Sequence, residues 1–195
     1  MVALPLVPPV VPAGRLAAME QPVLGLASGW ELRPWRLDDA DALLAAAQDP
    51  AIRHWNRLVV DSPEGARQRI GRMRRRWQDE LSAIWAVARP GGAAAGLIGW
   101  GDIDLAGGGA EIVYWLLPEA RGGGVAVDAT ERVSRWALDG LGLHRLRLCH
   151  SVANTASCRV AERARYSFEG TLRSALLHAD GWHDEHLHAL VRGDI

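Results

Sequence analysis

A glycine-rich turn between a strand-like and a helix-like stretch constrains the fold of this chain more than any other feature. Residues 111–117 are rich in β-branched and aromatic side chains, which favour a strand, and Pro118 cannot continue the ladder. From 126 to 137 the apolar residues instead recur at helical spacing. The intervening turn therefore leads from the end of a strand into the beginning of a helix; it reads Arg121-Gly122-Gly123-Gly124-Val125-Ala126.

This turn has the composition of a phosphate-binding loop. The first amides of a helix have no partner within the helix, and the helix dipole favours an anion beside them. The glycines at 122–124 permit close approach and positive φ, and Arg121 adds a positive charge. A chain with 21 glycines can also place three of them in a simple turn, but the strand before and the helix after favour a binding loop.

Two familiar phosphate motifs do not fit this loop. A Walker A loop needs Gly-Lys-Ser/Thr, and the chain contains no lysine. A dinucleotide fingerprint needs a glycine where Val127 stands. The remaining pattern, Arg-x-x-Gly-x-Ala from Arg121, Gly124 and Ala126, resembles the acetyl-CoA pyrophosphate loop of the GNAT superfamily of N-acetyltransferases. The wider stretch 110–122 resembles the RimJ/RimL-type branch, which acetylates protein N-termini.

Composition narrows the class of protein. A chain of 195 residues suits one domain with a substantial core. A net charge of −1 gives no basic excess for nucleic acid, and no apolar run approaches the length of a membrane span. The two cysteines, Cys149 and Cys158, make no disulfide framework, so a reducing cytoplasm is the expected compartment.

The first 29 residues differ from the rest of the chain. They hold five of the ten prolines, few charges and no clear hydrophobic period. Proline at this density disfavours both helix and central strand. We therefore predict a mobile tail or loosely packed arm over 1–29, followed by one domain over 30–195. Deletion of such a tail is expected to leave the melting temperature nearly unchanged.

The remaining pattern predicts alternating strands and helices. Strands are expected at 30–37, 83–89, 97–103, 111–117, 145–151, 167–177 and 183–191; helices are expected at 38–48, 62–77, 126–137 and 154–164. This order resembles the GNAT fold, an α/β (α+β) fold whose mixed, mostly antiparallel sheet has splayed central strands and flanking helices. The resemblance implies that acetyl-CoA lies between those strands and that its pantetheine pairs with free backbone groups at Leu116 and Leu117.

Acyl transfer to an amine requires a neutral nucleophile, a polarised carbonyl and a protonated leaving thiolate. Glu111 is the candidate base. Alternation places it on one strand face with Val113 and Trp115, where apolar neighbours would raise its pKa. Ala-Glu-Ile-Val also resembles the strand that carries the general base in some GNAT enzymes. A strand-end glutamate that is solvated or paired with an arginine is an equal alternative.

Ser157 is the candidate acid. Many GNAT enzymes carry an acid tyrosine in the helix expected at 154–164, but Ala161 stands at that position. RimJ/RimL-type chains have the form Asn154-x-x-Ser157 instead, which implies that Ser157 donates to sulfur and that Asn154 binds the pantetheine amides. Helix capping is the alternative for both residues. Arg165 replaces the family's usual glycine after this helix, where a left-handed conformation would be strained.

Histidines near the C-terminus raise the question of a metal site. His186 and His188 would face the same way on a strand, while His178 and His183 flank a predicted hairpin turn. Their spacing matches no known metal site, so we predict surface or acceptor-site histidines and no metal. Cys158 has no evident His/Asp partner and is interpreted as packing. Most tryptophans belong to the core, with a few expected along an acceptor cleft: Trp35, Trp55, Trp100 and Trp115.

Together these motifs predict an acetyl-CoA-dependent N-acetyltransferase in which the amine attacks directly within a ternary complex. The expected acceptor is a protein N-terminal α-amine. A small amine, such as an aminoglycoside or a polyamine, and a catalytically silent acyl-CoA-binding regulator are the alternatives. Neither nucleic acid nor a membrane is expected as a partner, and a homodimer is left open. The expected cofactor-binding residues are Leu116, Leu117, Arg121, Gly122, Gly123, Gly124, Val125, Ala126 and Asn154.

Overall fold

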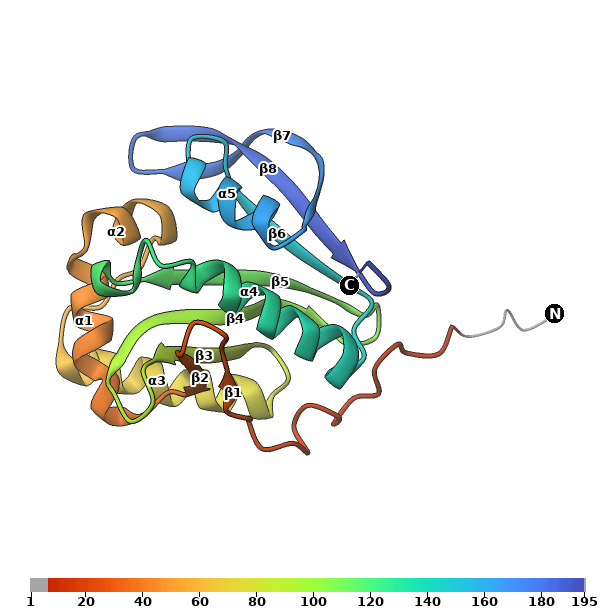
Figure 1. Ribbon diagram of the computed structural model, residues 1–195, viewed down its shortest axis with the longest axis horizontal. Coiled ribbons are helices and arrows are strands. Elements are labelled where there is room, and N and C mark those ends of the chain that lie inside the picture. Colours follow the sequence, from red (N-terminus) through yellow and green to blue (C-terminus); the bar gives the residue numbers. More distant parts are fainter. Residues whose placement is uncertain (1–6, 195) are drawn as a thin grey trace.

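The computed structural model describes residues 7–194 and has an eight-stranded sheet at its centre (Figure 1). The sheet order is β1-β2-β3-β4-β5-β6-β8-β7, and each neighbouring pair is antiparallel except β5–β6. The mixed, mostly antiparallel sheet predicted from the sequence is thus confirmed. The strands are β1 Leu24–Gly25, β2 Glu31–Pro34, β3 Ala83–Ala88, β4 Ala94–Asp104, β5 Gly109–Leu116, β6 Arg145–Ser151, β7 Ser167–His178 and β8 Gly181–Val191.

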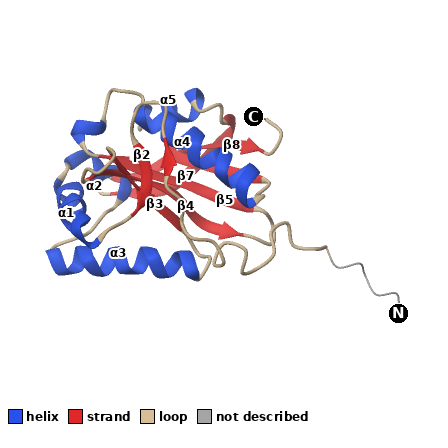
Figure 2. Cartoon of the chain, turned by 60° about the horizontal axis from the view of Figure 1, so that its bottom comes forward, coloured by secondary structure: helices blue, strands red, loops and turns tan. Residues whose placement is uncertain are grey.

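Helices cover both faces of this sheet (Figure 2). α1, α2 and α3 pack on one face, and α4 and α5 pack on the other. A π-helical turn, Trp136–Leu141, continues α4 and ends at Gly142, whose positive φ is typical of a helix C-terminus. Within residues 7–194, none of the helices has the length and apolarity to cross a membrane. The helices are α1 Ala40–Gln48, α2 Pro50–Asn56, α3 Pro63–Gln78, α4 Val125–Arg135 and α5 Thr155–Arg163.

Polar side chains determine where several of these helices begin. The hydroxyl of Ser62 accepts the N–H of Gly65 at 3.1 Å, which confirms the predicted start of α3. The short segment after Asp49 is a helix of its own, α2, because the Asp49 carboxylate accepts the N–H of Ile52 at 2.9 Å. The helix expected from residue 38 begins instead at Ala40, after a 3-10 turn over Leu37–Asp39.

The Asp39 carboxylate is buried, and an ion pair with the buried Arg33 compensates its charge. It receives two hydrogen bonds from the Arg33 guanidinium, at 2.7 and 2.8 Å, and others from the N–H groups of Arg36 and Ala94. Burial by itself raises the pKa of Asp39, but these donors outweigh it and hold that pKa below its ordinary value. The pair joins β2 to the beginnings of α1 and β4.

The prediction of a loosely packed arm is wrong for the part of 1–29 that the structure describes; residues 1–6 lie outside it. Val11 and Leu16 are 2% and 0% exposed, and Leu24 lies in β1, which extends the sheet beyond β2. Prolines prevent a regular helix here, but side chains elsewhere satisfy the backbone. The Glu80 carboxylate accepts the N–H groups of Gly14 and Leu16, at 2.6 and 2.7 Å, and also that of Ala17.

We expect Leu16→Ala to lower the free energy of unfolding by about 2–5 kcal/mol, because it leaves a cavity where a fully buried side chain was. In a domain of this size, the melting temperature should fall by at least about 4 °C, measured by circular dichroism. Val7→Ala is the matched control in the same segment, since Val7 is 90% exposed. A Leu16→Ala melting temperature equal to that of the wild type would show that this segment does not contribute to the core.

Candidate functional site

The site lies where β5 and β6 separate. The two strands run parallel and pair at three positions: Gly109 with Arg145, Ala110 with Leu146, and Glu111 with Arg147. In the part of the chain that the structure describes, the pairing ends at Glu111. Beyond that point a cavity of 810 Å³ fills the gap. β5 and β6 form its walls, together with α5, α2 and the hairpin of β7 and β8. Figure 1 shows how these strands and helices are arranged.

The backbone of β5 turns one amide toward this cavity and another away from it. The N–H of Leu117 donates to the carbonyl of Ala95 at 2.8 Å, so it belongs to the ladder with β4. Alternate residues of an antiparallel strand point in opposite directions. The N–H of Leu116 therefore points away from β4, toward the side that β6 has left. Leu116 is available to a ligand, whereas the structure contradicts the free amide expected at Leu117.

The glycine-rich turn presents open backbone at the beginning of α4. Gly122 and Gly124 have φ values of +81° and +76°, and apart from their chain neighbours no atom of residues 7–194 lies within 4 Å of a Cβ at either position. The N–H of Asp128 is bonded to the carbonyl of Gly124, in the regular helical pattern. The three preceding amides, at 125–127, are the ones that a helix leaves without internal partners. This is the geometry that accommodates an anion.

Arg121 is tied to the protein more firmly than its sequence position suggests. Its Nε donates to the carbonyl of Leu116 at 2.9 Å, and its Nη2 lies 2.9 Å from Oδ1 of Asp49. Burial by itself raises the pKa of Asp49, but hydrogen bonds from Arg121 and Ile52 outweigh it and hold that pKa below its ordinary value. Arg121 therefore links the end of β5 to the beginning of α2 while it contributes positive charge to the cavity rim.

Two further arginines beside the loop were missed from the sequence. Arg159 and Arg163 of α5 line a side cavity of 310 Å³ together with Gly122 and Gly124. Their spacing of four residues places both on one face of the helix, and that spacing is the signal that could have identified them. They bring two more positive charges beside the loop.

A tyrosine that the sequence analysis did not consider lies beside Ser157. The hydroxyls of Tyr114 and Ser157 are 2.5 Å apart, and Ser157 is 8% exposed. Burial raises the pKa of Tyr114 to about 12, so the phenol stays protonated at neutral pH. Although α5 lacks the expected tyrosine, β5 supplies one from across the cavity. The alternation of β5 is the signal, since even-numbered residues face α4 and α5.

The capping interpretation holds for Asn154 but not for Ser157. The side-chain oxygen of Asn154 accepts the N–H of Ser157 at 3.1 Å, so Asn154 caps α5. The hydroxyl of Ser157 binds Tyr114 instead of the helix backbone. Both residues line the cavity. After this helix, Arg165 has a φ of 63°, so the residue in place of the family's glycine does adopt the left-handed conformation.

Glu111 lies in a partly buried environment and is also paired with an arginine, the two possibilities that the sequence left open. Its carboxylate lies 3.1 Å from Nη2 of Arg147, yet burial is the larger influence and raises the pKa of Glu111. A second carboxylate, that of Glu185 on β8, lines the same end of the cavity and adds to the rise. This end is therefore acidic and partly desolvated.

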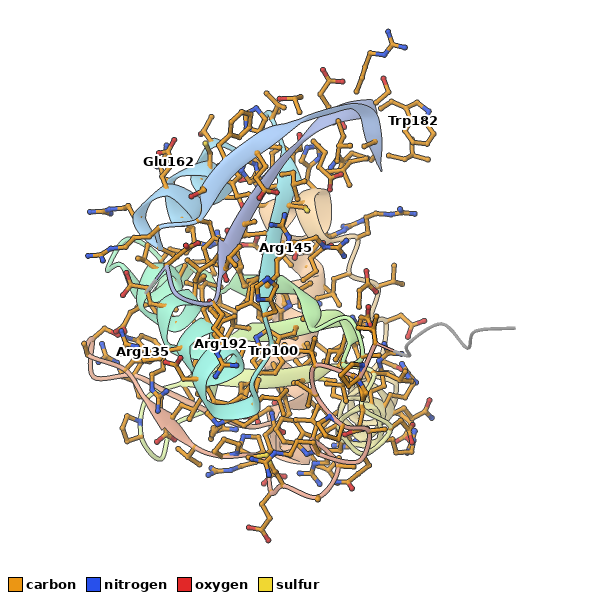
Figure 3. All side chains as sticks on the ribbon, turned by 90° about the vertical axis from the view of Figure 1, so that its right-hand side faces the viewer. Trp100, Arg135, Arg145, Glu162, Trp182 and Arg192 are labelled. Carbon is orange, nitrogen blue, oxygen red and sulfur yellow. The ribbon has the colours of Figure 1, made fainter. Side chains whose placement is uncertain are left out.

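Part of the cavity wall is aromatic. Trp55 and Trp115 line it, as expected, whereas Trp35 and Trp100 are 1% and 0% exposed and belong to the core. Trp182 also lines the cavity, although 64% of its surface is exposed. Figure 3 shows Trp182 projecting at the tip of the β7–β8 hairpin. Its local sequence does not distinguish it from the other eight tryptophans.

The sequence of this chain is similar to those of known and provisionally named acetyltransferases. The family model described as "Acetyltransferase (GNAT) domain" matches residues 30–167. YdaF of Bacillus subtilis (strain 168), provisionally named a ribosomal N-acetyltransferase, is 32% identical over 111 residues. That alignment covers 57% of this chain and 60% of YdaF, so the chain spans less than two thirds of that relative.

Comparison with solved structures supports the same architecture. Mycobacterium smegmatis RimJ, solved with CoA-disulfide, superposes with a TM-score of 0.79 and 22% identity over 89% of this chain and 88% of its own. RimL, a ribosomal L7/L12 α-N-protein acetyltransferase solved with coenzyme A, has a TM-score of 0.78 and 19% identity over 87% of this chain and 98% of its own. At these identities the likeness shows the fold.

We expect Arg147→Ala to raise the pKa of Glu111 further, because it removes the positive charge that opposes the effect of burial. Carboxyl chemical shifts followed by NMR as a function of pH measure this directly. Arg145→Ala is the matched control, because Arg145, from the same strand, binds Glu169 instead. An unchanged or lowered pKa of Glu111 in Arg147→Ala would contradict the assignment of this ion pair.

Proposed function

Because this chain belongs to the GNAT acetyltransferase family, we propose that it transfers the acetyl group of acetyl-CoA to the N-terminal α-amine of a protein. One observation carries this proposal: a single cavity has all the parts that the reaction needs along its walls. An anion site lies at one end, two hydroxyls lie along its wall, and carboxylates lie at the other end. The residues concerned are Arg121, Ala126, Leu116, Tyr114, Ser157, Glu111 and Glu185.

The loop at the beginning of α4 suits the pyrophosphate of acetyl-CoA. The open amides at 125–127 and the glycines at 122–124 offer hydrogen bonds and close approach. Arg159 and Arg163 add positive charge beside these glycines. The pantetheine then extends along β5, where the N–H of Leu116 is available to it and to the thioester carbonyl. Asn154, at the beginning of α5, is a further polar group along this path.

The two buried hydroxyls suit the departing thiolate. As the bond between carbon and sulfur breaks, the Ser157 hydroxyl donates to sulfur, and the Tyr114 phenol donates to the oxygen of Ser157. A phenol with a pKa of about 12 keeps its proton at neutral pH, so the donor is always in place. The cost of burying these hydroxyls is offset because they bind each other.

The opposite end of the cavity suits an amine. Glu111 has a raised pKa, and this makes it a better acceptor for the proton that the attacking amine loses. Glu111 and Glu185 together attract a positively charged group before it loses that proton. Trp55 and the exposed Trp182 offer flat apolar surfaces at the mouth, which suit the first residues of a peptide. The provisional name of YdaF adds support for a ribosomal-protein acceptor.

The acceptor class is tested by measuring thiol release with purified chain and acetyl-CoA. A panel of peptides with free N-termini is compared with N-terminally blocked peptides and with small amines, including an aminoglycoside and a polyamine. We expect release only with free α-amines. Thiol release only with small amines would show that the acceptor is a small amine and not a protein N-terminus. Acetyl-CoA binding without release for any amine would identify a regulator.

We expect Gly124→Glu to abolish acetyl-CoA binding while the protein stays folded. A side chain at this position would fill the open face of the loop, and its carboxylate would repel phosphate. Calorimetric titration measures the affinity, and circular dichroism confirms the fold. Gly91→Glu is the matched control, since Gly91 has a φ of +75° and equally open surroundings in another turn. Wild-type affinity in folded Gly124→Glu would refute the phosphate site.

We expect Glu111→Gln to lower turnover on a peptide α-amine by about ten- to a hundredfold near neutral pH, at the weak end of general-base effects. An α-amine has a pKa of about 7.7–8.0, so the base mainly carries away a proton. The loss should therefore shrink toward pH 9, where the amine is mostly neutral. Ser157→Ala and Tyr114→Phe should leave a deficit that persists at high pH, because the thiolate still lacks its donors.

The pH–rate profiles of these three variants are compared with that of Glu64→Gln, an exposed carboxylate on α3 outside the cavity. A loss in Glu111→Gln that does not change with pH would restrict Glu111 to a structural role beside Arg147. Full activity in Ser157→Ala would restrict Ser157 to packing.

A further inference from the structure

A cluster of three imidazoles and one thiol lies between α5 and the strands beneath it. We propose that His150, Cys158, His186 and His188 bind one zinc ion. Each side chain offers one ligand atom, and these atoms all lie within 4.8 Å of one another. The site goes beyond the proposed transfer reaction, and it replaces the prediction that the chain binds no metal.

Strand register accounts for this grouping. His150 of β6 lies directly opposite His186 of β8, and His188 is two residues further along β8, on the same face. α5 covers that face and brings Cys158 to it. The same face of β8 was predicted for His186 and His188, but His150 and Cys158 come from two other elements. His178 and His183 lie elsewhere, beside His54 at the hairpin.

The cluster contains buried nitrogens that lack hydrogen-bond partners. His150 and His188 are 5% and 2% exposed. Their Nε2 atoms, and Nδ1 of His186, are buried and have no hydrogen-bond partner within the described part of the chain. A buried polar atom without a partner is costly, and three such atoms at one place call for a ligand.

In His150 and His188, the hydrogen bond made by Nδ1 indicates which ring nitrogen carries the proton. Nδ1 of His150 lies 2.9 Å from the carbonyl oxygen of Ser151, and Nδ1 of His188 lies 3.4 Å from that of Tyr166. A carbonyl only accepts, so each Nδ1 carries the proton and each Nε2 presents a lone pair. Histidine ligands of metals are typically oriented in this way, by a backbone carbonyl on the opposite nitrogen.

The donor set suits zinc. Three imidazole nitrogens and one thiolate are common zinc ligands, and four of them complete a tetrahedral site. Zinc lies about 2.0–2.1 Å from nitrogen and about 2.3 Å from sulfur, so the ligand atoms would draw together on binding. Cys158 would lose its proton to solvent as the metal–sulfur bond forms. The carboxylate of Glu162, 3.6 Å from the sulfur, would balance the remaining positive charge.

Such a site would fasten α5 to β6 and β8. Ser157 directly precedes Cys158, and His150 also lines the main cavity. The metal would therefore lie in the wall beside the Ser157 hydroxyl and fix the helix that carries it. The site is separate from the hairpin tip, since Figure 3 shows Glu162 of α5 and Trp182 at distant points of the molecule.

The test uses the untagged full chain, stripped with a chelator and dialysed. Zinc chloride is titrated calorimetrically, and cobalt(II) is added in a parallel series as a spectroscopic probe. We expect one equivalent of each metal to bind. Cobalt should produce the intense visible bands of a tetrahedral site and a near-ultraviolet band from thiolate-to-metal charge transfer. Zinc should also raise the melting temperature, and a chelator should reverse that rise.

Two variants and two matched controls identify the ligands. Cys158→Ser should remove the charge-transfer band and weaken zinc binding at least tenfold, and His186→Gln should weaken it similarly while the fold is kept. Cys149→Ser, which changes the other free cysteine, and His178→Gln, which changes a buried histidine outside the cluster, should bind as the wild type does. Absence of zinc binding in the wild type would overturn the proposal. So would a zinc affinity equal to that of the wild type in both Cys158→Ser and His186→Gln. In either case the four side chains would be a packed cluster.

Discussion

The site depends on one feature of the sheet, the end of the β5–β6 pairing at Glu111. Each strand keeps its other neighbour, β4 for β5 and β8 for β6, so both remain in a ladder while they diverge. The divergence leaves the Leu116 amide without a strand beside it and opens a cavity of 810 Å³. A ligand can then provide the hydrogen bonds that a neighbouring strand would otherwise provide.

Positive and negative groups lie at different places along this cavity, which is the distribution that the proposed reaction requires. Positive charge and free helix amides lie at the beginning of α4, whereas the carboxylates of Glu111 and Glu185 lie at the root of the gap. Arg121 contributes to the first end and is held by Asp49, which also caps α2. A single ion pair thus connects Arg121, at the start of the glycine-rich loop, to the beginning of α2.

The buried polar groups around α5 fall into two kinds. Tyr114 and Ser157 satisfy each other at 2.5 Å, so they can be buried without a ligand and remain ready to donate. Within the part of the chain that the structure describes, the histidines at 150, 186 and 188 have buried nitrogens without hydrogen-bond partners. Both the Tyr114–Ser157 pair and the histidines contact α5. A metal ion bound by the histidines would therefore affect how rigidly the Tyr114–Ser157 pair is held.

The sequence by itself determined the features that depend on neighbouring residues. The order of strands and helices from β2 onward, apart from α2, follows from hydrophobic period and turn chemistry, whereas β1 and α2 were not predicted. The glycine-rich loop, the Asn154 cap and the candidate residues Glu111 and Ser157 follow from short motifs, which act over a few residues. Tertiary structure decided what depends on distant contacts. The pairing of Tyr114 with Ser157, the packing of Leu16, the loss of the Leu117 amide to Ala95 and the grouping of His150 with Cys158 require strand register and helix packing. Local patterns do not encode which surfaces of different strands and helices meet, because that choice is made by the core as a whole.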